Sequence, residues 1–348
     1  MYNEAKFNSL PRFAEPNIEA EDITGLYISL GKNQESLDNI EQMLDALIQP
    51  PKKSFRKAAM ERLWWYRAID NSANNKLVIN RLGQALSSFP TSVPMAILVL
   101  AGNYYGSLDH AIKLAALLDT IDNPSSLFYP PPPPKNKKQR PKFKVPKLWK
   151  MCKVSGSDHL TLLQVFLTFE KYRPVEHAFC KEFRVQFKKI KEIKRLEHQI
   201  RNVILPNSQE SILGTTLIGG KPKRSKKRSF KPVKIDPMII KPLLKCLAHA
   251  LSGQVATYDI DYKGLVLDND SSDDNPVPST FGSRAKNKVL KDRMSIVDEK
   301  NCKLNQPCIF SSLVIQTRSW NVNYLSSAIP HKWISTLETL SRDHKGNA

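Results

Sequence analysis

Two stretches rich in lysine and proline interrupt this chain and prevent it from folding around one continuous core. The first, at 130–153, opens with five consecutive prolines, and the second, at 219–234, is dominated by lysine and arginine. Because polyproline is extended and runs of like charge repel, we expect both stretches to be exposed. A third stretch, at 268–288, has no apolar period and is expected to be a long loop. Three ordered blocks are left, at 18–82, 83–205 and 235–340, with 130–153 as an insert and 206–234 as a basic linker.

The net charge of +20 is concentrated in the same two stretches. Of the 53 lysines and arginines, 17 lie within 134–153 and 221–234, where there is no acidic residue, which leaves 36 against 33 acidic residues elsewhere. Such runs are typical of nuclear-import signals and of contacts to nucleic-acid phosphates, although a solubilising linker has the same composition. The candidate residues within them are Lys135, Lys137, Lys138, Arg140, Lys223, Arg224, Lys226, Lys227 and Arg228.

The motifs of several function classes are missing from the sequence. No run approaches 18 consecutive apolar residues and the first residues lack a signal-peptide core, so we expect no membrane contact. The five cysteines are scattered without a CxxC pair, which favours reduced thiols in the cytosol or nucleus and no metal site. There is no GxxxxGK[ST] phosphate loop, no GxSxG and no HExxH. We therefore expect no catalytic residue, no metal and no cofactor on this chain.

The periods of the three blocks predict an α+β multi-domain protein. The first block has helical patterns at 20–30, 37–48 and 53–68 and a short strand at Leu77–Ile79, which are the ingredients of a winged helix. The second block is helical, with two helices predicted to pack together and a later helix that Ser157 or Asp158 can cap. His159 is predicted to be a structural hydrogen-bonding residue rather than a metal ligand.

The third block changes from helix to strand. An apolar helix at 238–253 precedes strand-like runs within 254–267, 293–298 and 308–317. This order suits a small β-barrel of the OB type, and a sandwich also fits.

A basic stripe follows the stretch FCKEFRVQFKKIKEIKRLEHQIRNVI at 179–204. Its apolar residues recur at steps of three and four, so we expect one helix with a buried face. The candidate contacts on the opposite face are Lys181, Arg184, Lys188, Lys191 and Arg195. A solvated face has the same pattern, and the interspersed Glu182, Glu192 and Glu197 favour local ion pairing.

Several of these motifs occur in an order that resembles the C-terminal region of DEAH-box RNA helicases. LVINRLGQALSSFPTSVPMAILVLAG is similar to the passage from the winged helix into the helicase-associated, or ratchet, domain. GSDHLTLLQVFLTFEKY and FCKEFRVQFKKIKEIKRLEHQI resemble two ratchet helices, and CIFSSLVIQTRSWNVNYLSSAIPHKWISTL resembles the end of the OB domain. The KEIKRLEHQ run is most similar to the branch that acts in small-subunit ribosomal RNA maturation.

The resemblance implies domain assignments and a function. It implies a remnant that follows the second motor lobe at 1–17, a winged helix at 18–82, a ratchet domain at 83–205, an OB domain at 235–340 and a tail at 341–348. In the family these domains border a channel for single-stranded RNA, which implies pre-ribosomal or small nucleolar RNA as the partner and the nucleus, especially the nucleolus, as the location.

Two departures from the family limit what the resemblance implies. The motor lobes are missing, so the ATP and Mg²⁺ of the family belong to a motor that this chain lacks, and the chain is not expected to be an enzyme by itself. RMSIVDEKN stands where the family has a histidine-proline-serine-serine turn.

Three hypotheses follow from the sequence. The first is an accessory RNA-binding module of a helicase. The second is a non-catalytic scaffold that holds a protein partner, such as a glycine-patch activator or a separate helicase motor. The third is a nuclear winged-helix DNA-binding protein.

Overall fold

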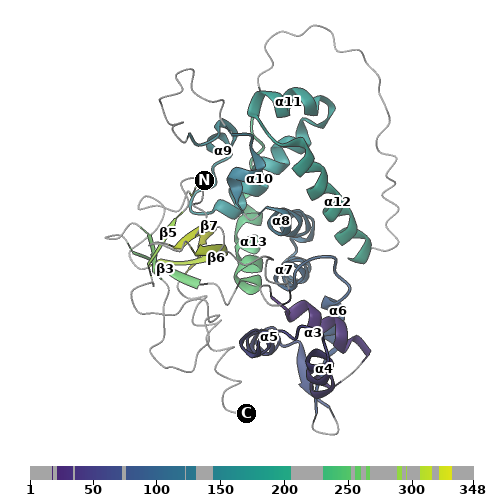
Figure 1. Ribbon diagram of the computed structural model, residues 1–348. Helices are drawn as coiled ribbons and strands as arrows, with labels where there is room; N and C mark the ends of the chain where they lie inside the picture. The colour runs from purple at the N-terminus through teal and green to yellow at the C-terminus, as the bar shows by residue number, and fades with distance from the viewer. Residues whose placement is uncertain are drawn as a thin grey trace, which may run out of the picture. The chain divides into compact units, whose positions relative to one another are not determined.

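The protein has an α+β fold, which a computed structural model describes in part (Figure 1). The described residues are 18, 22–33, 36–72, 76–121, 123–130, 144–204, 230–251, 295 and the strands and their flanks at 255–259, 264–266, 288–291, 306–315 and 321–330. The candidate residues of both basic stretches, the two chain ends and most of the 268–288 loop lie outside them. The prediction that all of 130–153 is exposed is wrong, because Leu148, Trp149 and Cys152 are buried. Within these ranges, no helix combines the length and the apolar character needed to cross a bilayer.

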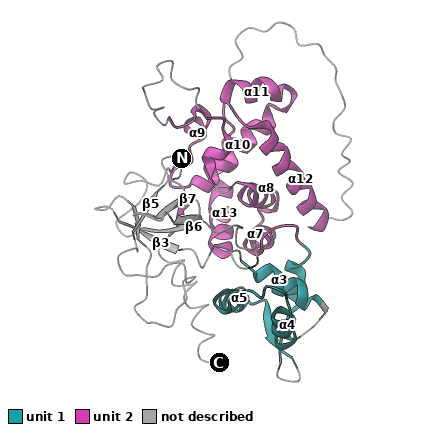
Figure 2. Cartoon of the chain, in the orientation of Figure 1, with its two compact units in different colours: residues 1–88, 274–280 teal, residues 89–273, 281–348 magenta. Residues whose placement is uncertain are grey.

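The chain divides into two compact units, of which the first comprises residues 1–88 and 274–280 (Figure 2). Its helices are α3 (Thr24–Leu30), α4 (Leu37–Asp45), α5 (Lys53–Trp65) and α6 (Arg81–Leu86), and its strands are β1 (Ile69–Asn71) and β2 (Leu77–Ile79). The two strands pair antiparallel, with Ile69 opposite Ile79. The three predicted helices and the predicted strand at 77–79 are confirmed, whereas β1, which directly follows the stretch predicted as helix at 53–68, was not predicted.

The second unit, residues 89–273 and 281–348, has a helical core. Its helices are α7 (Val93–Tyr104), α8 (Leu108–Thr120), α9 (Lys147–Met151), α10 (Asp158–Lys171), α11 (Glu176–Phe183), α12 (Phe187–Ile204) and α13 (Pro237–Ala250). α8 contacts α7, α10 and α12, and α13 packs against α7. α7 and α8 approach closely at Gly102, where an added Cβ would lie 2.2 Å from the Cβ of Ala111.

Helix α10 is buried on almost every side. Its cap is the predicted Ser157, whose hydroxyl accepts a hydrogen bond from the Leu160 amide. Leu160, Leu163 and Phe166 are each 0% exposed. The polar residues Thr161, Gln164 and Thr168 are buried as well, so α10 lies in the interior of the second unit and these side chains need partners there.

An extended segment at 230–235 lies along one face of α10. The backbone amides of Lys231, Val233 and Ile235 donate to Tyr172 Oη, Thr168 Oγ1 and Gln164 Oε1 at 2.8, 2.9 and 3.1 Å. Every second residue of an extended chain lies on the same side, as does every fourth residue of a helix. The amides of 231, 233 and 235 can therefore each meet one side chain at 172, 168 and 164. The polar side chains of α10 thus satisfy the backbone of this segment.

Five strands form a closed barrel in the order β3, β4, β5, β7, β6. They are β3 (Val255–Asp259), β4 (Gly264–Val266), β5 (Lys288–Lys291), β6 (Gln306–Ile315) and β7 (Asn321–Ala328). β6 closes on β3, and β5 and β7 are parallel while the other neighbours are antiparallel. Strands within 254–267 and 308–317 are confirmed, but β5 and β7 were not predicted as strands. Of the strand predicted at 293–298 the structure describes only Ser295, which is not in a strand.

The barrel meets the start of α10 through a buried polar cluster. The Ser327 hydroxyl lies 2.7 Å from His159 Nδ1 and 2.6 Å from the Ser157 hydroxyl. Burial lowers the pKa of His159 to about 3, so its ring is neutral near pH 7. The prediction that His159 is a structural hydrogen-bonding residue is confirmed by these contacts.

The close approach at Gly102 leads to a stability prediction. Gly102→Ala should lower the free energy of unfolding by about 1–3 kcal/mol, because the new methyl group must push α7 and α8 apart. Chemical denaturation followed by circular dichroism measures this. Gly25→Ala in α3 is the control, because its added Cβ would meet nothing within 4 Å, and it should be neutral or slightly stabilising. An unchanged midpoint for Gly102→Ala would contradict the described packing.

Candidate nucleic-acid interface

The predicted single helix at 179–204 is wrong, because the structure breaks it into α11 and α12. Arg184 ends α11 in the left-handed region, with φ 58° and ψ 35°. Val185 forms a β-bridge with Phe128, the Tyr129 amide donates to the Arg184 carbonyl at 2.7 Å, and the Gln186 amide donates to the Leu127 carbonyl at 2.8 Å. A backbone that pairs with 127–129 in this way cannot continue as a helix.

The structure nevertheless exposes all five predicted stripe residues. Lys188, Lys191 and Arg195 lie on one face of α12, because positions three and seven apart fall within about 60° of each other. Lys181 is on α11, and Arg184 is its cap. With the described residues, Lys181, Lys188 and Arg195 form no ion pair, whereas Glu192 pairs with Lys189 at 2.9 Å. The predicted local pairing therefore involves a lysine outside the stripe.

A surface depression of about 360 Å³ brings part of the stripe together. It is lined by Tyr129, Cys180, Lys181, Arg184, Val185 and Phe187. The ammonium group of Lys191 lies 4.8 Å from the centre of the Phe187 ring, within the range of a cation–π contact. Two of the five stripe residues, Lys181 and Arg184, thus line this depression. Lys191 lies over the ring of Phe187, and Lys188 and Arg195 extend the basic surface along α12.

Sequence analysis missed Tyr129, which is 54% exposed at the depression. The preceding Phe128 is 5% exposed, so the two neighbouring aromatic residues point to opposite environments. The sequence signal was an aromatic pair directly before the five prolines, which has no helical or strand period of its own.

The described residues next to both basic stretches are attached to α11. The Arg184 guanidinium donates to the carbonyl oxygens of Tyr129 and Pro130, at the start of the first stretch. Near the other end of that stretch, the Lys147 ammonium pairs with Glu182 at 3.3 Å and lies 5.6 Å from the centre of the Phe183 ring.

The second stretch has an aromatic attachment. Phe230, two residues after Arg228, has its ring centre 5.4 Å from that of Phe179 and 5.6 Å from that of Phe183. The described ends of both basic stretches therefore contact α11 or its cap Arg184.

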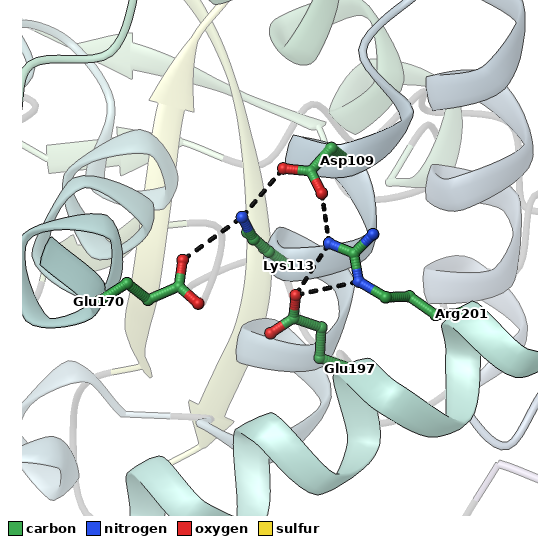
Figure 3. Close-up of polar contacts among 5 residues, drawn as sticks. All are labelled: Asp109, Lys113, Glu170, Glu197 and Arg201. Atoms are coloured by element: carbon green, nitrogen blue, oxygen red, sulfur yellow. Dashed lines mark hydrogen bonds and ion pairs between the residues drawn. The ribbon is translucent and has the colours of Figure 1, made fainter. Parts of the chain in front are cut away.

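Charged side chains from three helices fix α12 in place (Figure 3). Lys113 of α8 pairs with Asp109 at 2.9 Å and with Glu170 of α10 at 3.3 Å. Arg201 of α12 contacts Asp109 and pairs with Glu197 at 2.9 Å. Burial raises the pKa of Glu197, and the Arg201 hydrogen bond offsets only part of this effect. Burial would also raise the pKa of Asp109, but hydrogen bonds from Arg201 and Lys113 hold it below its ordinary value.

The chemistry available at this surface is binding. Burial raises the pKa of the Cys180 thiol to about 11, with a smaller contribution from Glu176, so the thiol is protonated at neutral pH and is a poor nucleophile. In the part of the chain that the structure describes, no group of three or more His, Cys, Asp or Glu residues is arranged to hold a metal ion. Exposed cations beside an exposed aromatic ring match the combination with which proteins hold single-stranded nucleic acid.

Comparison with known proteins finds a distant sequence similarity to an RNA helicase. No protein-family model matches the chain. A stretch of 186 residues, 52% of the chain, is 24% identical to the ATP-dependent RNA helicase dhx29 of Xenopus laevis and covers 12% of that protein. The chain thus has a distant relationship to an RNA helicase and spans a small part of its length.

The charge network leads to a pH-dependent prediction. Arg201→Met should lower the free energy of unfolding by about 2 kcal/mol at pH 8, less than the loss expected for a fully buried pair, since 22% of the Arg201 side chain is exposed. Without the guanidinium, the pKa of Glu197 and Asp109 rises in the folded state. Because a raised folded-state pKa costs stability as pH rises through it, the loss should be smaller at pH 5.

The control for this experiment is Lys189→Met on the same helix. Its ion pair with Glu192 is between side chains that are 36% and 42% exposed, so the loss of stability should be small at either pH. Denaturation midpoints at pH 5 and pH 8 measure both variants. Equal losses for Arg201→Met at the two pH values would count against the described network.

Proposed function

We propose that this chain is an accessory RNA-binding region of the kind that follows the motor of DEAH-box RNA helicases. The observation that carries the proposal is the basic surface on α11 and α12, to which the described ends of both basic stretches are attached. The contacts of Arg184 with Pro130 and of Phe230 with Phe183 hold the chain next to Lys181. Positive charge that converges on one surface favours a polyanion over a neutral partner.

The architecture supports the finer domain assignments. Helices α3 to α5 with the β1–β2 pair have the composition of a winged helix, and the helices α7 to α12 are in the range proposed for the ratchet domain. The closed five-stranded barrel is the architecture of an OB fold, which binds oligonucleotides on one face and in its loops. The boundaries at 82, 205 and 235 remain predictions.

The proposed division of labour leaves ATP hydrolysis to another part of a helicase. ATP and Mg²⁺ would bind the motor lobes, and this region would hold the RNA strand on which the motor acts. Such a role needs phosphate contacts and stacking rather than a base-reading code.

We further propose a pre-ribosomal or small nucleolar RNA as the bound strand and the nucleolus as the location. The support is the similarity of the KEIKRLEHQ run to the branch that processes small-subunit ribosomal RNA, together with the import-like basic stretches. Sequencing of RNA crosslinked to the protein in cells tests this, and reads dominated by messenger RNA would contradict it.

A second candidate function is to hold a glycine-patch activator or a helicase motor chain. It is favoured by apolar side chains at and after the end of α4, where Met43, Leu47 and Ile48 are 45%, 41% and 101% exposed. A Leu47→Glu/Ile48→Glu variant should lose such a protein partner in co-purification and keep its RNA affinity. Retention of the partner by this variant would contradict the hypothesis.

The salt dependence of RNA binding tests the primary function. Replacing Lys188, Lys191 and Arg195 by Gln removes three phosphate contacts, so the slope of log K against log salt should become less negative by about 2. Fluorescence anisotropy with a labelled single-stranded RNA at several salt concentrations measures this slope.

A matched control neutralises Lys53, Lys57 and Arg81, which are exposed in the first unit. It has the same change in net charge and should leave the slope within about 0.5 of the original. An equal change in both variants would mean that net charge, and not the α12 face, determines binding. No salt dependence in the unmodified protein would overturn the proposed function.

A further inference from the structure

We propose that the depression at Tyr129 receives one unpaired nucleobase of the bound RNA, which stacks on the Tyr129 ring while adjacent phosphates contact Lys181 and Lys191. This inference rests on the proposed function. The cations of the surface account for contacts to phosphates, and the inference adds a contact to a base. The first step is the size of the depression, since about 360 Å³ is at the lower end of the range for small-ligand sites.

The second step is that the backbone below the ring is fixed before any ligand binds. The Tyr129 amide donates to the Arg184 carbonyl at 2.7 Å, and the Tyr129 carbonyl accepts from Arg184 Nε at 3.4 Å. The Phe128 carbonyl accepts from Gln186 Nε2 at 3.2 Å, and Phe128 itself is buried. Tyr129 is thus held in place while its side chain remains 54% exposed. A site ordered in advance loses little conformational entropy on binding.

The third step concerns the charge around the ring. None of the six lining residues is acidic, and two of them, Lys181 and Arg184, are cations. The neighbouring carboxylate of Glu182 is paired with Lys147 at 3.3 Å. A cationic ligand would be repelled here, whereas a base that carries a phosphate on each side places its aromatic face on Tyr129 and its negative charge on the cations.

The fourth step is the continuity of the depression with the α12 face. Phe187 lines the depression, and Lys191 lies over its ring at 4.8 Å, so the basic row of α12 begins at the edge of the depression. A strand whose phosphates follow Lys188, Lys191 and Arg195 therefore reaches Tyr129 without leaving the surface.

The test compares an RNA oligomer with an oligomer of the same length in which every base is removed. The unmodified protein should bind the RNA more tightly than the abasic oligomer, because only the RNA can stack. Tyr129→Ala should weaken RNA binding by about 5- to 150-fold and leave abasic binding unchanged. Tyr129→Phe should restore tight binding, because the ring provides the stacking surface.

Tyr104→Ala is the matched control. Tyr104 is 82% exposed at the end of α7 and does not line the depression, so its removal should leave both affinities unchanged. Thermal melting establishes that Tyr129→Ala is folded, which is expected for an exposed side chain.

Three outcomes would overturn the inference. If the protein binds RNA and the abasic oligomer equally in a salt-dependent manner, the proposed function stands and the base site fails. If an acidic peptide displaces RNA from the unmodified protein and loses affinity with Tyr129→Ala, the depression holds a protein segment. If the protein binds no RNA at any salt concentration, the proposed function and the base site both fail.

Discussion

The burial of α10 is the interaction on which the second unit depends. Its apolar side chains are surrounded by other elements, and its buried polar side chains bind other parts of the chain. His159 contacts β7 of the barrel through Ser327, while Gln164 and Thr168 bind the backbone of the 230–235 segment. In an interior from which water is excluded, an unmatched polar group costs several kcal/mol, so these partners are required once the helix is buried. Barrel, extended segment and helical core are thereby coupled to one helix.

The burial of α10 also holds α11, which is part of the basic surface, in place. Phe169 near the end of α10 has its ring centre 5.8 Å from that of Phe179, and Tyr172 stacks on Phe179 at 5.7 Å. These contacts hold α11 against α10, and Phe230 completes the cluster at 4.9 Å from Tyr172. The described ends of both basic stretches therefore contact the aromatic cluster that holds α11 against α10.

Sequence patterns predicted the elements that are fixed by a buried face and missed those fixed by a distant contact. The apolar period of α12 was sufficient because Ile190, Ile193 and Ile200 are all buried. The break before it was not predictable, since an arginine carries no signal for a left-handed backbone and the cause is the pairing of Val185 with Phe128, far away in sequence. The strands β5 and β7 were missed for a similar reason, because a closed barrel imposes strand pairing on segments with weak local preference. The candidate site followed the same rule: the exposed cations of α12 were predicted, and the depression between two chain segments was not.

The proposed nucleic-acid binding combines two contributions that composition alone does not distinguish. Phosphate contacts by exposed lysines release counterions and weaken steeply as salt rises, whereas stacking on an aromatic ring changes little with salt. The net charge of +20 predicts only the first contribution, and most of that charge is in stretches whose sequence also suits a solubilising linker. The ring of Tyr129, which is exposed on a fixed backbone, provides a surface for the stacking contribution. Binding that persists at high salt would therefore have to come from the folded surface of α11 and α12 and not from the basic stretches, which makes the residual high-salt affinity the most direct measure of what this fold contributes.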